Sequence, residues 1–135
     1  MPLNQTTDYA LRILIYLGQE KRVVPSSEMA KTIGRSQRYL LSVARKLKQH
    51  EYINVVFGPA GGYLLARPLD QIILHDVIVL MEGSTAVSHC MEQEGHCGEE
   101  KPCILHNMYS SLQAIVENYL RNLTVDMLIN HPTGD

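Results

Sequence analysis

The 135-residue chain has little of what marks secreted or membrane proteins. The apolar run from Val77 to Met81 is far too short to span a bilayer. The first residues, Met1 to Gln5, lack the basic segment and apolar stretch of a signal peptide. With 45% hydrophobic residues, the composition excludes wholesale disorder, and the length excludes a two-lobed cofactor enzyme. We therefore expect a cytoplasmic protein with one folded domain or one domain and an appendage, and no membrane partner.

Basic residues are scarce in the second half of the chain. Residues 70–135 contain two Lys/Arg and ten Asp/Glu, a net charge of −8, whereas residues 1–69 contain ten and four, a net of +6. The overall charge of −2 conceals this asymmetry. A basic half joined to an acidic half is typical of nucleic-acid-binding proteins, which places such binding in residues 1–69.

The apolar spacing in the first half predicts three helices, over residues 4–20, 26–33 and 36–49, with Gly18 ending the first. Gly34 separates the second and third helices, and Ala30 precedes it by four residues. Two short helices joined by a tight glycine turn are typical of a helix-turn-helix.

A β-hairpin is predicted directly after these helices. Residues 52–57 and 63–66 are rich in β-branched and aromatic side chains, and the glycine-rich segment 58–62 lies between them. A hairpin in this position is a wing, and a glycine-rich tip either serves only as a turn or also lets the backbone approach DNA closely.

The second half is predicted to contain a linker helix over about residues 70–82, a polar loop over 84–103, a long helix over about 101–123 and a short helix over 125–129. The long helix carries an apolar stripe with coiled-coil-like spacing at Leu105, Met108, Leu112, Ile115, Tyr119 and Leu123. This stripe either packs on the chain's own core or joins two copies in a homodimer, which we expect. The predicted fold class is mainly α with a small β-hairpin wing, with a winged helix-turn-helix in residues 1–69 and a linker, cysteine loop and long C-terminal dimerisation helix in 70–135.

Six basic residues and one acidic residue, Glu28, lie between Ser26 and His50. The N-terminal residues of the second helix of a helix-turn-helix meet base edges, and Arg, Gln and Ser can donate to bases or phosphates. A solvated basic face is the alternative for this charge run. The candidate DNA-binding residues are Arg35, Ser36, Gln37, Arg38, Tyr39, Arg45, Lys46, Lys48, Gly58, Gly61 and Gly62. Among them we expect Ser36, Gln37 and Arg38 to read or position DNA and Arg35, Arg45, Lys46 and Lys48 to neutralise phosphate.

The three cysteines of the chain lie within fourteen residues, in the pattern Cys90-x6-Cys97-x5-Cys103-x2-His106. In a reducing compartment, an odd cluster of this kind indicates metal or redox chemistry and not a disulfide framework. Thiolates with one imidazole suit structural zinc or an iron–sulfur cluster, and the spacing does not choose between them. His89 and His96 are further candidate ligands, although exposed loop histidines are the simpler interpretation, and the cysteines could also be free thiols.

The order of these parts resembles the iron–sulfur-responsive transcription repressors typified by IscR, NsrR and RirA. The resemblance extends from Thr7-Asp8-Tyr9-Ala10-Leu11-Arg12 to Asn122-Leu123-Thr124. It is strongest in Arg38-Tyr39-Leu40 and in the wing, Gly58-Pro59-Ala60-Gly61-Gly62-Tyr63-Leu64-Leu65.

This resemblance implies that Cys90, Cys97 and Cys103 bind a [2Fe–2S] or [4Fe–4S] cluster that senses iron, redox state or nitric oxide. His106 resembles the fourth ligand of one branch of the family. Asp8 resembles that of another, in which the partner chain supplies it. We favour His106, because its spacing from Cys103 suits the start of a helix.

The sequence departs from the family's pattern at two places. Phe57 stands where the family often has Arg, which implies a weaker grip of the wing on DNA. Leu41 and Ser42 replace acidic and amide residues of the recognition helix, which implies a different operator sequence.

The predicted function is therefore that of a repressor that binds double-stranded operator DNA, with no enzymatic activity and no small-molecule substrate. One alternative is a winged-helix regulator with a zinc or thiol/disulfide switch. The other is an enzyme with a nucleophilic cysteine, against which no supporting acid–base constellation is present.

Overall fold

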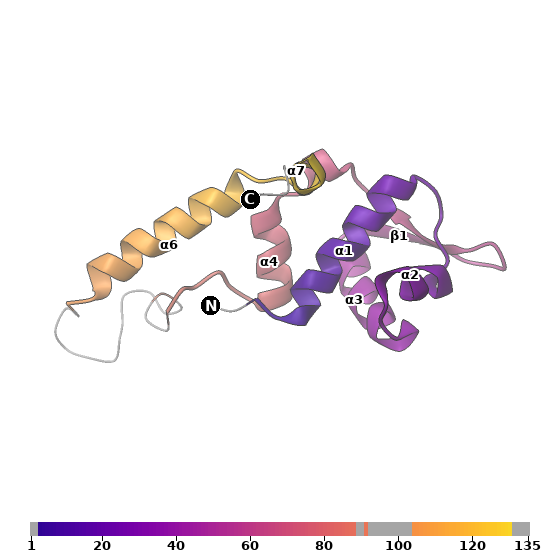
Figure 1. Cartoon of the computed structure of the whole chain (residues 1–135), viewed down its shortest axis with the longest axis horizontal. Helices are drawn as coiled ribbons and strands as arrows, with labels where there is room; N and C mark the ends of the chain where they lie inside the picture. The colour runs from indigo at the N-terminus through magenta and orange to yellow at the C-terminus, as the bar shows by residue number, and fades with distance from the viewer. Residues whose placement is uncertain (1–2, 89–90, 92–103, 131–135) are drawn as a thin grey trace.

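The computed structural model describes residues 3–88, 91 and 104–130. Its helices are α1 (Gln5–Glu20), α2 (Ser26–Ile33), α3 (Gln37–Gln49), α4 (Leu74–Glu82), α6 (His106–Arg121) and α7 (Val125–Asn130). A two-stranded sheet of β1 (Ile53–Val56) and β2 (Gly62–Leu65) follows α3, and a 3-10 turn, η1 (Leu69–Gln71), precedes α4. Figure 1 shows α1 at the centre, with the hairpin and α6 at opposite ends of the molecule.

Helix α1 forms the axis of the core. Asn4 caps its start, accepting a hydrogen bond from the backbone N–H of Thr7 at 3.2 Å. Its apolar residues recur at helical spacing and are fully buried among α2, α3, α4, α7 and β2; they are Ala10, Ile13, Leu14 and Leu17. The position of every other element around α1 depends on this apolar face.

Helices α2 and α3 form the predicted helix-turn-helix. Gly34 ends α2 with φ +82°, and its N–H donates to the carbonyl of Ala30 at 2.9 Å. The inward residues of this pair belong to the same core as α1; they are Met29, Leu40, Val43, Ala44 and Leu47. The glycine turn and the two helices are thereby confirmed.

The hairpin after α3 is confirmed as a wing. β1 and β2 pair in antiparallel register, with Ile53 opposite Leu65 and Val56 opposite Gly62. Val24 adds a third, single-residue bridge, exchanging two 2.8 Å backbone hydrogen bonds with Tyr63. The wing is therefore anchored to the segment between α1 and α2 as well as to α3.

Three predicted boundaries are wrong. Gly18 does not end α1, which continues to Glu20 and is closed by Lys21 at φ +54°. A Cβ at Gly18 would lie 2.3 Å from Leu69 Cδ1, so this glycine permits close packing of η1 on α1.

The linker helix begins at Leu74 and not at residue 70, because Ile72 and Ile73 are extended and pair with residues 123–125. The long helix begins at His106, after a turn at Ile104 and Leu105, and ends at Arg121. Leu123, which the predicted stripe included, therefore lies beyond the helix and packs against the cluster of Leu74, Ile78 and Leu120.

The core continues across the predicted boundary after residue 69. Ile72, Val77, Met81 and Val125 are buried in the same cluster as the α1 residues. Helix α6 is different: it packs mainly on α4, where Leu120 joins Leu74 and Ile78, and its N-terminal half projects away from the core (Figure 1). Residues 1–69 and 70–135 thus differ in charge and expected role but share one core.

Candidate functional site

The candidate DNA-binding residues on and before α3 fall into two groups. Four of them have side chains that hold the helix-turn-helix together; they are Arg35, Ser36, Gln37 and Tyr39. The other four project from the exposed surface of α3; they are Arg38, Arg45, Lys46 and Lys48. The spacing of charges along the sequence did not predict this division.

Arg35 lies in the interface between α1 and α3. Its guanidinium carbon is 4.6 Å from the ring centroid of Tyr39 and 5.1 Å from that of Tyr9, and the two rings pack edge to face. One guanidinium nitrogen donates to Gln5 Oε1 at 2.9 Å, while Nε is buried without a hydrogen-bond partner in the described part of the chain. These contacts make Arg35 a residue that positions α3 on α1.

The two residues that follow Gly34 and Arg35 also have structural roles. Ser36 is the N-cap of α3, and its Oγ accepts from the N–H of Tyr39 at 3.2 Å. Gln37 donates to Ser26 Oγ at 2.7 Å and so ties the start of α3 to the start of α2. Both side chains are exposed, so DNA contact is compatible with these roles.

The exposed cations of α3 face the same region as the wing. Lys48 Nζ lies 5.5 Å from the ring centroid of Phe57. Burial raises the pKa of Tyr63 on β2, and the nearby charge of Arg45 opposes that shift. Across the described residues, no hydrogen bond or ion pair engages the side chains of Arg38, Arg45 or Lys46, which leaves these charges available to phosphate.

The wing glycines are explained by the hairpin itself. A Cβ at Gly61 would lie 2.1 Å from the carbonyl oxygen of Val56, and one at Gly62 would lie 2.2 Å from that of Val24. Gly58 has φ +107° and open space around it. Contact of these residues with DNA remains a prediction.

The metal-ligand candidates are only partly described. Cys90, Cys97, Cys103, His89 and His96 lie outside the described residues. Asp8, in the first turn of α1, forms a 2.7 Å ion pair with Arg12 in which both side chains are more than half exposed. Within residues 3–88, 91 and 104–130, no three His, Cys, Asp or Glu side chains converge as a metal site would require.

Helix α6 carries a polar stripe of His106, Ser110, Gln113 and Glu117, which lie on one face at helical spacing. His106 Nε2 is 3.4 Å from Ser110 Oγ. Gln113 Oε1 accepts from the N–H of Val87 at 2.7 Å, and Nε2 donates to the carbonyl of Thr85 at 2.9 Å.

Thr85 is buried beside this stripe, and its hydroxyl donates to Glu117 Oε1 at 3.3 Å. The polar stripe therefore holds the segment that leads toward Cys90.

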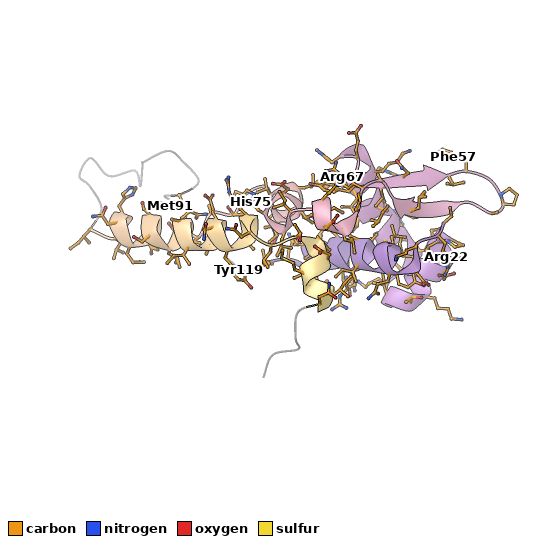
Figure 2. The ribbon with its side chains drawn as sticks, turned by 90° about the horizontal axis from the view of Figure 1, so that it is seen from above. Arg22, Phe57, Arg67, His75, Met91 and Tyr119 are labelled. Atoms are coloured by element: carbon orange, nitrogen blue, oxygen red, sulfur yellow. The ribbon has the colours of Figure 1, made fainter. Side chains whose placement is uncertain are left out.

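A second stripe, formed by α6 and the residue that precedes it, is apolar and exposed. Its members, on a face turned away from the polar stripe, are between 41% and 67% exposed; they are Leu105, Met108, Leu112, Ile115 and Tyr119. Tyr119 projects from α6 in Figure 2. A row of this kind on a projecting helix is suited to a partner surface.

Two features were missed by sequence reasoning. The role of Gln113 was detectable only as a glutamine seven residues after His106, on the same helical face. Arg67 donates to the carbonyls of His50 and Glu51 at 3.2 Å and stacks on Tyr52 at 4.4 Å, which closes the end of α3.

None of the helices in the described ranges has the length and hydropathy needed to cross a bilayer.

The chain is similar to known transcriptional regulators over nearly its whole length. The IscR regulator of Sodalis glossinidius is 32% identical over 133 residues, which cover 97% of this chain and 80% of that protein. A putative helix-turn-helix regulator of Aquifex aeolicus is 30% identical over 96% of this chain and 92% of its own.

The fold is shared with solved structures of the same kind. CymR, the global cysteine regulator of B. subtilis, superposes with a TM-score of 0.81 at 21% identity over 98% of both chains. IscR of T. potens superposes with a TM-score of 0.76 at 21% identity over 98% of this chain and 89% of its own.

These similarities confirm the predicted winged-helix fold and agree with a regulator and not an enzyme. Residues 3–131 match the model of a family described as iron-dependent transcriptional regulators. The chain therefore belongs to the Rrf2 family of transcriptional regulators.

Proposed function

We propose that this regulator is a cytoplasmic, homodimeric repressor. It binds operator DNA through residues 1–69 and an iron–sulfur cluster through its cysteine segment, residues 84–103. The observation that carries the proposal is the two-faced helix α6. One face carries His106 and Gln113, and Gln113 forms hydrogen bonds with the backbone of Thr85 and Val87. The opposite face exposes a row of apolar side chains. One helix thus joins the predicted sensor to the predicted dimer interface.

The DNA-binding part of the proposal is supported by the surface of α3. The cations of α3 are exposed; they are Arg38, Arg45, Lys46 and Lys48. The one acidic residue between Ser26 and His50 is Glu28, and its carboxylate accepts hydrogen bonds from Arg22 and Tyr16. The local field is therefore more positive than the charge count suggests. Each cation that neutralises a phosphate releases counterions, so binding should weaken steeply with salt.

The donor set in and beside the cysteine segment fits an iron–sulfur cluster. Cys90, Cys97 and Cys103 would supply thiolates and His106 the fourth ligand, a combination known for such clusters and for zinc. Since His106 is the first residue of α6, it lies at the junction of the cysteine segment and the long helix. When bound, the cluster would supply a centre that reacts with oxidants and nitric oxide.

Asp8 remains the rival fourth ligand. Its carboxylate is exposed, but Arg12 holds one oxygen at 2.7 Å and the dipole of α1 favours a negative charge in this turn. Ligation by Asp8 would have to displace or share this ion pair, whereas among the described residues the His106 ring contacts Ser110 alone, at 3.4 Å. The structure therefore supports the choice of His106.

The proposed mechanism depends on the mechanical connection through α6. His106 and Gln113 are seven residues apart on one face of α6. A movement of the cysteine segment would therefore be transmitted to α6 through both residues. If α6 joins two protomers, that change alters the separation of the two α3 helices. Thermodynamic linkage then requires that operator DNA change the affinity for the cluster by the same factor.

Anaerobic purification followed by iron and sulfide analysis and native mass spectrometry tests the proposal. We expect iron and sulfide in the wild type, their loss in His106→Ala and their retention in Asp8→Ala. The controls are His50→Ala and Asp70→Ala, which remove an exposed side chain of each kind outside the site. Loss in Asp8→Ala and retention in His106→Ala would assign the ligand to Asp8.

A zinc or thiol/disulfide switch is the second candidate. It is supported by the structural similarity to CymR, which is described as the global cysteine regulator of B. subtilis and not as an iron-dependent regulator. Colourless anaerobic protein that contains zinc, or titrates as three free thiols without iron and sulfide, would establish this candidate and exclude the cluster.

A further inference from the structure

Phe57 is the single phenylalanine of the chain, and it is 83% exposed. It directly follows β1 on the wing and lies near the outer end of the hairpin (Figure 2). Burying such a side chain is favourable by about 1.5–3 kcal/mol, so leaving it in water forgoes a large gain. An apolar ring held at a projecting tip is suited to contact with another molecule.

The surroundings of Phe57 identify the chemistry of that molecule. Lys48 Nζ lies 5.5 Å from its ring centroid, and Arg45 acts electrostatically on Tyr63 in the paired strand. The ring therefore stands beside the exposed cations of α3. An apolar protein partner would have to desolvate these charges, whereas a polyanion with apolar walls satisfies the cations and the ring together.

DNA has this combination of features. Its minor groove is lined by sugars between two rows of phosphates, and proteins insert Phe, Leu or Pro side chains there between base steps. The wing is stiffened for such a task, because Val24 pairs with Tyr63 behind it and Gly62 has no room for a side chain.

We propose that Phe57 enters the minor groove of the operator as an apolar wedge beside the major-groove contacts of α3. This inference rests on the proposed DNA binding and adds a mode of recognition to it. A ring carries no charge, so the contact neutralises no phosphate. Its strength depends on how easily a base step opens, which favours flexible pyrimidine–purine steps at the position that the wing meets.

The salt dependence separates this mode from phosphate binding. We expect Phe57→Ala to weaken binding about tenfold while leaving the slope of log K against log salt unchanged. Phe57→Arg should restore affinity at low salt and steepen that slope by about 0.9. Lys46→Ala, in contrast, should make the slope shallower by about the same amount.

The chain contains no tryptophan, so Phe57→Trp creates a single fluorophore at the proposed contact. The experiment titrates this variant with a duplex selected by the wild-type protein from a random-sequence pool. We expect quenching on binding as the indole stacks. Met127→Trp, an exposed position on α7, serves as the control whose emission should not change.

Unchanged emission of Phe57→Trp on bound DNA, or wild-type affinity of Phe57→Ala, would overturn the inference. If Lys46→Ala still weakens binding in that case, the proposed DNA binding stands and only the wedge is wrong. If the wild-type protein selects no duplex at all, DNA binding itself is wrong. The melting temperature of each Phe57 variant should equal that of the wild type, because Phe57 is exposed.

Discussion

Gln113 and Val87 are joined by a 2.7 Å hydrogen bond in which the side-chain carbonyl of Gln113 accepts from the backbone N–H of Val87. The amide of the same side chain donates to the carbonyl of Thr85. One residue of α6 thereby satisfies the backbone on both sides of Ala86, as a neighbouring strand would. This contact decides how the start of the cysteine segment lies on α6.

Gln113→Leu should loosen this segment. The substitution leaves the buried Thr85 hydroxyl with fewer partners and the Val87 N–H with none, which costs about 1–3 kcal/mol. Hydrogen exchange should show faster exchange at Val87, and iron retention should fall even though no ligand is altered. Gln19→Leu, at an exposed position of α1, is the matched control, and equal exchange at Val87 in both variants would contradict the prediction.

Substitutions of Arg35 and Arg38 should have different effects, the first on stability and the second on DNA binding. Arg35→Gln removes the cation between Tyr9 and Tyr39, so we expect a loss of about 1–2 kcal/mol in the free energy of unfolding and an unchanged salt slope for DNA binding. Arg38→Gln should leave the melting temperature unchanged and reduce the slope by about 1. Thermal melts and fluorescence anisotropy at several salt concentrations measure both effects. A reduced slope for Arg35→Gln at unchanged stability would restore Arg35 to the phosphate contacts.

Ile115→Glu should separate the proposed homodimer into monomers. Ile115 lies in the middle of the exposed apolar row and is 67% exposed, so a carboxylate there does not disturb the core of one chain but cannot be buried unpaired against a second copy. Sedimentation velocity at micromolar concentration measures the result. Ala114→Glu, at an exposed position of the same helix outside the row, should stay dimeric, and dimers of both variants would place the interface elsewhere.

Glu28→Gln should destabilise the protein in a pH-dependent way. Hydrogen bonds from Arg22 and Tyr16 hold the pKa of Glu28 below its ordinary range. A carboxyl whose pKa is lowered on folding contributes stability above its unfolded pKa, and that contribution is lost as the pH falls through the folded value. The melting temperature of Glu28→Gln should therefore lie below that of the wild type at pH 7, and the difference should vanish in acid. A difference that keeps its pH 7 size throughout the acid range would show that the ion pair is not its cause.

Much of the fold was predictable, because short-range patterns report it. The apolar spacing of α1 and α3, the αL glycine at position 34 and the glycine turn between two β-branched runs each act within a few residues. The charge division at residue 69 likewise requires only counting. The helix-turn-helix, the wing and the presence of a linker helix follow from these local signals, whereas the regulator family was indicated by a resemblance in the order of these parts.

The tertiary structure decided what depends on distant partners. Ile72 and Ile73 leave the helix because residues 123–125 offer backbone hydrogen bonds, and Gly18 stays within α1 because Leu69 packs against it.

The roles of the basic residues also depend on long-range contacts. Arg35 and Arg38 are three residues apart and belong to one run of charges. Of the two, Arg35 is the one that stacks on Tyr9 of α1. A sequence pattern counts charges, but the free energy of each charge depends on what the fold places beside it.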